Sequence, residues 1–143
     1  MKITSKGRYA VMAMVDIARN SNRSPCNLTH VSIRQNISLP YLERIFNDLK
    51  KANLVESQRG PGGGYRLSKS PNEIQILEIF YAIDEKIKAT GCLNNPNNFC
   101  TGEGKKCLTH EFWEGLEDLI GNYLQSISLS DLINGNKRIN SKI

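Results

Sequence analysis

A glycine-rich turn between two short strand-like segments is the feature that most constrains the fold of this 143-residue chain. Residues 54–59 are predicted to form one strand, and in residues 65–69 apolar and polar side chains alternate, as on a half-buried strand. The turn between them, Gly60–Gly64, contains four glycines and Pro61, and it is longer than a two-residue hairpin requires. Glycine permits positive φ and close approach to a surface, whereas proline stiffens the tip. The sequence therefore predicts a β-hairpin with a long tip.

Two short helices are predicted before this hairpin. The second begins after Ser38, a cap-type residue, and its apolar side chains recur at i, i+3, i+4 and i+7, so that one stripe is buried: Leu42, Ile45, Phe46 and Leu49. The first covers residues 28–35, with Leu28, Val31 and Ile33 as its inward side chains. Two short helices joined by a tight turn, the second with a polar outer face, form a helix-turn-helix. Together with the hairpin they predict a winged helix.

Further helices are predicted on both sides of this unit. Apolar positions predict a first helix in residues 10–18 behind the cap-type Thr4 and Ser5, a fourth from 76 to about 85, a long one over 109–125 and a short last one. Asn53 is predicted to end the third helix in the left-handed conformation. The long helix carries more apolar surface than one small domain must bury, which predicts a dimer interface formed by Phe112, Leu116, Leu119, Ile120 and Tyr123. The expected fold class is mainly α with a small β-hairpin.

The charge of the chain is unevenly distributed. The net charge is +5, but residues 1–69 hold twelve Lys and Arg against four Asp and Glu, a balance of +8, whereas residues 70–143 have a balance of −3. A basic half of this kind suits a phosphate-binding surface, because neutralised phosphates release counterions. An ordinary solvated surface is the alternative from charge alone. Since the basic half coincides with the winged helix, we expect it to bind duplex DNA.

The outer face of the third helix is expected to enter the major groove. Arg44 is suited to guanine and Asn47 to adenine, while Glu43 is suited to cytosine N4 and would repel phosphates at wrong sites. Candidate phosphate contacts are Lys6, Tyr9, Tyr41 and Lys51. At the hairpin tip, an arginine can enter a narrow minor groove. The candidate DNA-binding residues there are Arg59, Gly60, Pro61, Gly62, Gly63, Gly64 and Arg66.

Three cysteines and a histidine follow the spacing C-x7-C-x6-C-x2-H in the C-terminal half: Cys92, Cys100, Cys107 and His110. The last two lie at i and i+3 at a helix start, so their side chains can share a face. Four such ligands match either zinc or an iron–sulfur cluster, and the absence of a C-x2–4-C knuckle favours the cluster only weakly. Unrelated free thiols or a disulfide would also account for the cysteines. Cys26 lies in a different loop and is interpreted as incidental.

The expected setting is the cytoplasm, with no membrane contact. No apolar run approaches the roughly 20 residues that a bilayer requires, and the chain starts without an apolar signal segment. Nothing in the sequence favours catalysis, since no nucleophile–base pair is recognisable and Gly60–Gly64 lacks the Lys-Ser/Thr of a phosphate loop. A cluster carrier or redox enzyme is the competing class of function.

Several motifs resemble the Rrf-type winged-helix regulators: Ser5–Ala10, Ile37–Ser38 with Tyr41–Glu43, and Val55–Tyr65. Together with the cysteine motif they resemble the members of that family that control iron–sulfur cluster assembly genes. The resemblance covers residues 1 to about 133. It implies a homodimer that binds a 2Fe–2S cluster through the three cysteines and His110. It also implies that assembly proteins donate the cluster and that the protein mainly represses the cluster assembly genes.

The resemblance also suggests a division of the chain. The expected parts are a winged helix-turn-helix DNA-binding domain in residues 1–70, a linking helix and cysteine loop in 71–107, a dimerisation helix and short terminal helix in 108–134, and a frayed tail in 135–143. The alternative function is that of a related winged-helix regulator whose cysteine site holds structural zinc or is vestigial.

Overall fold

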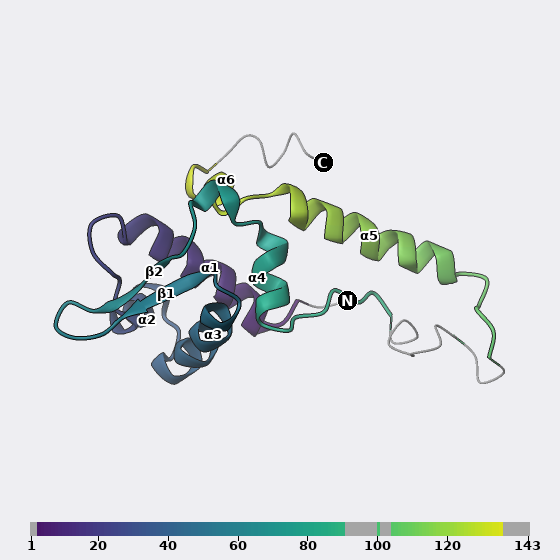
Figure 1. Cartoon of the computed structure of the whole chain (residues 1–143). Coiled ribbons are helices and arrows are strands. Elements are labelled where there is room, and N and C mark those ends of the chain that lie inside the picture. The colour runs from purple at the N-terminus through teal and green to yellow at the C-terminus, as the bar shows by residue number, and fades with distance from the viewer. Residues whose placement is uncertain (1–2, 91–99, 101–103, 136–143) are drawn as a thin grey trace.

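The computed structural model describes residues 3–90, 100 and 104–135 of the chain (Figure 1). Its elements in order are α1 (Ser5–Asn20), α2 (Leu28–Gln35), α3 (Leu39–Lys51), β1 (Val55–Gln58), β2 (Gly64–Leu67), the 3-10 helix η1 (Pro71–Glu73), α4 (Ile76–Ala82), α5 (His110–Ser126) and α6 (Leu129–Ile133). This mainly helical fold with a single antiparallel strand pair in the described part confirms the predicted fold class. None of the described helices is long and apolar enough to cross a membrane.

The core lies where α1, α2 and α3 meet, and α4, α6 and the first strand add buried side chains to it. The four side chains predicted to line the buried stripe of α3 are all 0% exposed. Each such burial contributes about 1.5–3 kcal/mol, so this stripe fixes α3 against the rest of the domain. The prediction for Ile33 was wrong, because its side chain is 74% exposed. It lies two residues beyond the buried Val31, a rotation of about 200° around the helix, and therefore points to the opposite side.

The helix ends follow local chemistry. Thr4 caps α1 by accepting a hydrogen bond from the Gly7 amide, and Asn27 caps α2. Ser38 occupies the N-cap position of α3 without a capping side-chain bond. Asn53 has the predicted left-handed conformation, with φ 57°, and the Leu54 amide donates a hydrogen bond to the Leu49 carbonyl at 3.0 Å. This turn sends the chain from α3 directly into β1.

The hairpin is shorter than predicted but has the expected position. β1 pairs antiparallel with β2, with Val55 opposite Leu67 and Gln58 opposite Gly64. Near the turn end of β2, the Tyr65 ring packs on Phe46 of α3 with ring centres 5.0 Å apart. The hairpin therefore lies directly beside the third helix, as a winged helix requires.

The C-terminal elements leave the domain and then return to it. Figure 1 shows α5 extending away from the winged helix, with α6 back beside α1 and η1. Two backbone bonds secure the return, from the Ile76 amide to the Ile127 carbonyl at 2.9 Å and from the Leu129 amide to the Ile74 carbonyl at 2.8 Å. The predicted capping box at Ser128 is present. As a result α5 is held at its C-terminal end, and its N-terminal end lies far from the core.

Candidate DNA interface and cysteine–histidine site

The outer face of α3 is presented to solvent. Since its apolar stripe is buried, the opposite side chains Glu43, Arg44, Asn47 and Lys51 are exposed. The fifth candidate on this helix, Tyr41, is half-buried and makes an edge-to-face contact with Tyr9 of α1, with ring centres 5.8 Å apart. The structure thus brings these candidates together on one surface, and their individual DNA contacts stay predictions.

Glu43 lies in a groove between α3 and the hairpin. The groove is also lined by Leu39, Gln58, Gly64 and Tyr65. Burial raises the pKa of the Tyr65 hydroxyl, and the negative charge of Glu43 raises it further, which places that carboxylate within electrostatic reach of Tyr65 on β2. A base or phosphate between α3 and the hairpin would therefore meet the negative charge of Glu43.

One part of the hairpin tip is exposed, and the other part packs against the loop that contains Cys26. Arg59 and residues 60–62 are exposed, whereas Gly63 and Gly64 are partly buried. A Cβ on Gly64 would lie 2.3 Å from the Cys26 carbonyl oxygen, so a larger residue does not fit there. Arg66 lies on β2 rather than at the tip and pairs with Glu56 at 3.4 Å, with both side chains 55% exposed. Such an exposed pair contributes little to stability, so Arg66 is available for an anion.

Lys6 is directed into the protein. Its ammonium donates to Asp48 Oδ2 in α3 at 3.0 Å and to the Ile83 carbonyl after α4 at 2.9 Å. The nearby Thr4 is bonded through its amide and hydroxyl to the carboxylate of Glu85. These contacts join α1, α3 and the end of α4. The phosphate contact predicted for Lys6 stays a prediction, because it would have to compete with two internal partners.

Three of the four candidate ligands come together at the start of α5. Cys100 Sγ lies 2.9 Å from His110 Nδ1, and the Cys107 thiol interacts with both Thr109 and Cys100. The hydrogen bond with the Thr109 hydroxyl, followed by that with Cys100, lowers the pKa of the Cys107 thiol. Cys92, the fourth candidate, lies outside the described residues. The grouping is possible because Cys107 and His110 are three residues apart at the beginning of a helix.

The donor atoms of this group suit a soft metal centre. His110 is 1% exposed and one of its ring nitrogens, Nε2, is buried without a hydrogen-bond partner among the described residues. A buried nitrogen of this kind costs free energy unless it is bonded, and thiolates with imidazole are the usual ligands of zinc and of some iron–sulfur clusters. Within residues 3–90, 100 and 104–135, no three or more His, Cys, Asp or Glu side chains form a ready metal-binding arrangement. The residue types fit, and their final arrangement depends on Cys92.

Sequence reasoning missed one polar cluster, which is centred on Asp16 in α1. This carboxylate is only 4% exposed and is bonded to Arg34 and Gln35 of α2. The available signal was an acidic residue within the apolar stripe of α1, next to Met14 and Ile17. A charge at such a position requires a buried partner.

These features define a winged-helix DNA-binding protein: a reading helix with an exposed polar face, a glycine-tipped hairpin beside it and a basic N-terminal half. The chain matches the Rrf2 family, described as iron-dependent transcriptional regulators, over residues 3–135, and it belongs to that family. The predicted family membership is thereby confirmed.

Relatives and solved structures agree with this assignment. The chain is 50% identical over 134 residues to the HTH-type transcriptional regulator IscR of Photorhabdus laumondii, covering 94% of this chain and 80% of that protein. It is 48% identical to IscR of Escherichia coli, covering 94% and 81%. Among solved structures, IscR of T. potens is 33% identical with a TM-score of 0.75 and covers 94% of this chain and 88% of that one. The global cysteine regulator CymR of B. subtilis is 28% identical with a TM-score of 0.79 and covers 96% and 99%.

These relatives are named as regulators and not as enzymes. The chain is accordingly a DNA-binding transcriptional regulator of the IscR type. DNA is its partner, as predicted.

Proposed function

We propose that this regulator senses the supply of iron–sulfur clusters through a 2Fe–2S site formed by Cys92, Cys100, Cys107 and His110, and that it mainly represses cluster-assembly genes. The observation that carries the proposal is the contact between Cys100 and His110, beside a buried histidine nitrogen that lacks a partner among the described residues. The three thiolates and the imidazole would hold the iron atoms. When bound, the cluster would supply a redox-active and labile centre, since histidine ligands are neutral and can be protonated.

The proposed DNA contacts follow from the placement of α3 and of the hairpin tip. Glu43, Arg44 and Asn47 of α3 would contact base edges in the major groove, and Tyr9, Tyr41 and Lys51 would contact the adjacent phosphates. The wing, defined as residues 59–64 with Arg66 at its base, would contact the neighbouring minor groove. The exposure of α3 and of the tip of the wing supports this arrangement.

We further propose that the functional unit is a homodimer formed through α5. This helix has 17 residues, and His110 is the only one of them that is buried. Phe112 and Leu119 are 65% and 68% exposed, which leaves an apolar face uncovered by the described part of the chain. A second copy of the same helix would cover that face with identical chemistry.

Sensing would work through the first turn of α5. Because His110 begins α5, its ligation would fix the end of the helix that is far from the core. The spacing between the two reading helices of a dimer determines which half-sites match, so the promoters bound would depend on whether the site is loaded. Cluster-donating assembly proteins would load it, and the protein would act in the cytoplasm. The division into residues 1–70, 71–107, 108–134 and 135–143 matches these roles.

Anaerobic reconstitution with iron and sulfide tests this function. We expect the wild-type protein to turn brown, with visible absorption and about two iron atoms per chain as a 2Fe–2S centre requires. Cys107→Ala should lose the absorption, whereas Cys26→Ser should keep it, because Cys26 lies in a loop between α1 and α2. Stoichiometric zinc in a colourless wild-type protein would refute the proposal and support a structural zinc site instead.

A further inference from the structure

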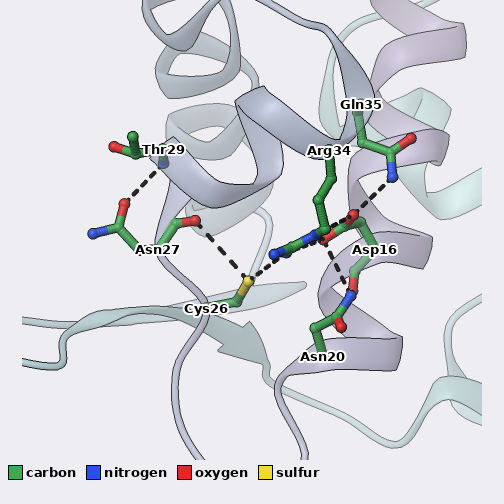
Figure 2. Close-up of polar contacts among 7 residues, drawn as sticks. All are labelled: Asp16, Asn20, Cys26, Asn27, Thr29, Arg34 and Gln35. Carbon is green, nitrogen blue, oxygen red and sulfur yellow. Dashed lines mark hydrogen bonds and ion pairs between the residues drawn. The ribbon is translucent and has the colours of Figure 1, made fainter.

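An ion pair between the buried carboxylate of Asp16 and the partly exposed guanidinium of Arg34 connects α1 to α2. Asp16 accepts hydrogen bonds from Arg34, from Nη2 to Oδ1 at 2.5 Å and from Nε to Oδ2 at 3.0 Å, and from Gln35 at 2.7 Å (Figure 2). Burial, the largest influence, raises the pKa of Asp16, but the bonds and charge of Arg34 and the bond from Gln35 outweigh it and hold the pKa below its ordinary value. The carboxylate is therefore charged, and it fixes the guanidinium of Arg34 in one orientation.

The same guanidinium makes a second contact. Arg34 Nη2 lies 3.1 Å from Cys26 Sγ, and Figure 2 shows the guanidinium between that sulfur and the carboxylate of Asp16. Cys26 is 7% exposed and lies just before Asn27, which caps α2. Arg34 thus holds the loop before α2 to the end of the same helix.

Cys26 is also the attachment point of the hairpin. Its amide donates to the Tyr65 carbonyl at 2.7 Å, and its carbonyl accepts from the Tyr65 amide at 2.8 Å. The Cys26 carbonyl is also the group that excludes a side chain at Gly64. Two-stranded hairpins are marginal by themselves, so this added backbone pair is a main support of the wing.

We propose that Arg34 is a positioning residue for DNA binding, which sets the wing relative to α3 by holding Cys26. Contacts run without a gap from Asp16 through Arg34 and Cys26 to Tyr65, whose ring packs on Phe46 of α3. The exposed residues 59–62 extend beyond the backbone contact between Cys26 and Tyr65. A displacement at Cys26 would therefore also move the tip of the wing. The inference rests on the proposed contact between the wing and the minor groove.

The test separates this role from a general effect on folding. Cys26→Ala removes the sulfur acceptor and leaves the pair of Asp16 with Arg34 intact, while Cys26→Ser is the matched control that keeps an acceptor. The probe is a duplex selected from a random-sequence library by the wild-type protein. We expect Cys26→Ala to bind it about fivefold more weakly, the size of one typical intramolecular hydrogen bond. Hydroxyl-radical protection in the minor groove should fall, while guanine protection in the major groove stays unchanged and circular dichroism shows that Cys26→Ala is folded at the assay temperature. Cys26→Ser should match the wild type.

A second variant reaches the same contact from the other side. Arg34→Lys keeps a positive charge beside Asp16 but lacks the planar fork that reaches both partners, so it should show the same selective loss. Wild-type affinity and full minor-groove protection in both Cys26→Ala and Arg34→Lys would overturn the inference, as would an equal loss in Cys26→Ser. Arg59→Ala tests the wing contact separately. If Arg59→Ala leaves minor-groove protection unchanged, the proposed wing contact fails, and the inference fails with it.

Discussion

The exposed face of α5 gives a quantitative prediction about assembly. Phe112 and Leu119 each leave about two-thirds of the side chain in solvent. Complete burial of such a side chain contributes roughly 1.5–3 kcal/mol, so covering the exposed part contributes about 1–2 kcal/mol. A two-fold interface buries each residue twice, and these two positions alone would then supply about 4–8 kcal/mol to the dimer.

Leu119→Glu should therefore abolish most of the association. It removes about 2–4 kcal/mol of apolar burial over the two copies and places two like charges near each other, so we expect the dimer Kd to rise at least about 100-fold. Sedimentation velocity over a range of protein concentrations measures this directly. The matched control is Gln125→Glu, which introduces the same charge on an exposed position about a third of a turn around the same helix.

Two results would refute this reasoning. An unchanged Kd for Leu119→Glu would show that the apolar face of α5 is not the interface. An equal increase for Gln125→Glu would show that added charge, rather than lost apolar burial, weakens the dimer. Far-ultraviolet circular dichroism should show native helix content in both variants, because Leu119 is 68% exposed and lies outside the monomer core.

Two further predictions concern stability. Phe46→Ala should lower the free energy of unfolding by about 3–5 kcal/mol in urea titrations, since Phe46 is 0% exposed and supports the Tyr65 ring; a loss below about 1 kcal/mol would contradict this packing. Because the pKa of Asp16 is lowered on folding, its stabilisation is complete above the ordinary value of 3.8 and is lost as the pH falls through the lower folded value. Urea titrations from about pH 5 to below about pH 3 should show this acid loss, and Asp16→Asn should remove its share of the slope; an equal slope in both proteins would exclude Asp16 as a source.

Local patterns in the sequence were sufficient to predict most of the winged helix. The core stripe of α3, the left-handed Asn53 and the capping box at Ser128 all depend on residues within a few positions of each other. The helical period alone correctly separated the buried side of α3 from its polar side. Ile33 shows the limit of this approach, because a short helix offers too few turns to define its buried side.

Contacts between distant segments could not be predicted in this way. The bond between Arg34 and Asp16 spans 18 positions, and the bond from Lys6 to the Ile83 carbonyl spans 77. Lys6 had the residue type and the position expected of a phosphate contact. Only the packed fold shows that its ammonium donates to two internal acceptors. The partners of a charged side chain are set by tertiary packing, which residue type does not encode.

The internal use of Lys6 has a physical consequence for the link between the two halves of the protein. Its ammonium joins Asp48 on the reading helix to the carbonyl of Ile83, while Thr4 at the same end of α1 holds Glu85. Any shift of residues 83–85 must therefore either carry Lys6 and Thr4 with it or break their bonds, and Lys6 is bonded to α3. The described contacts thus link residues 83–85 to α3 within one protomer, through the ammonium of Lys6.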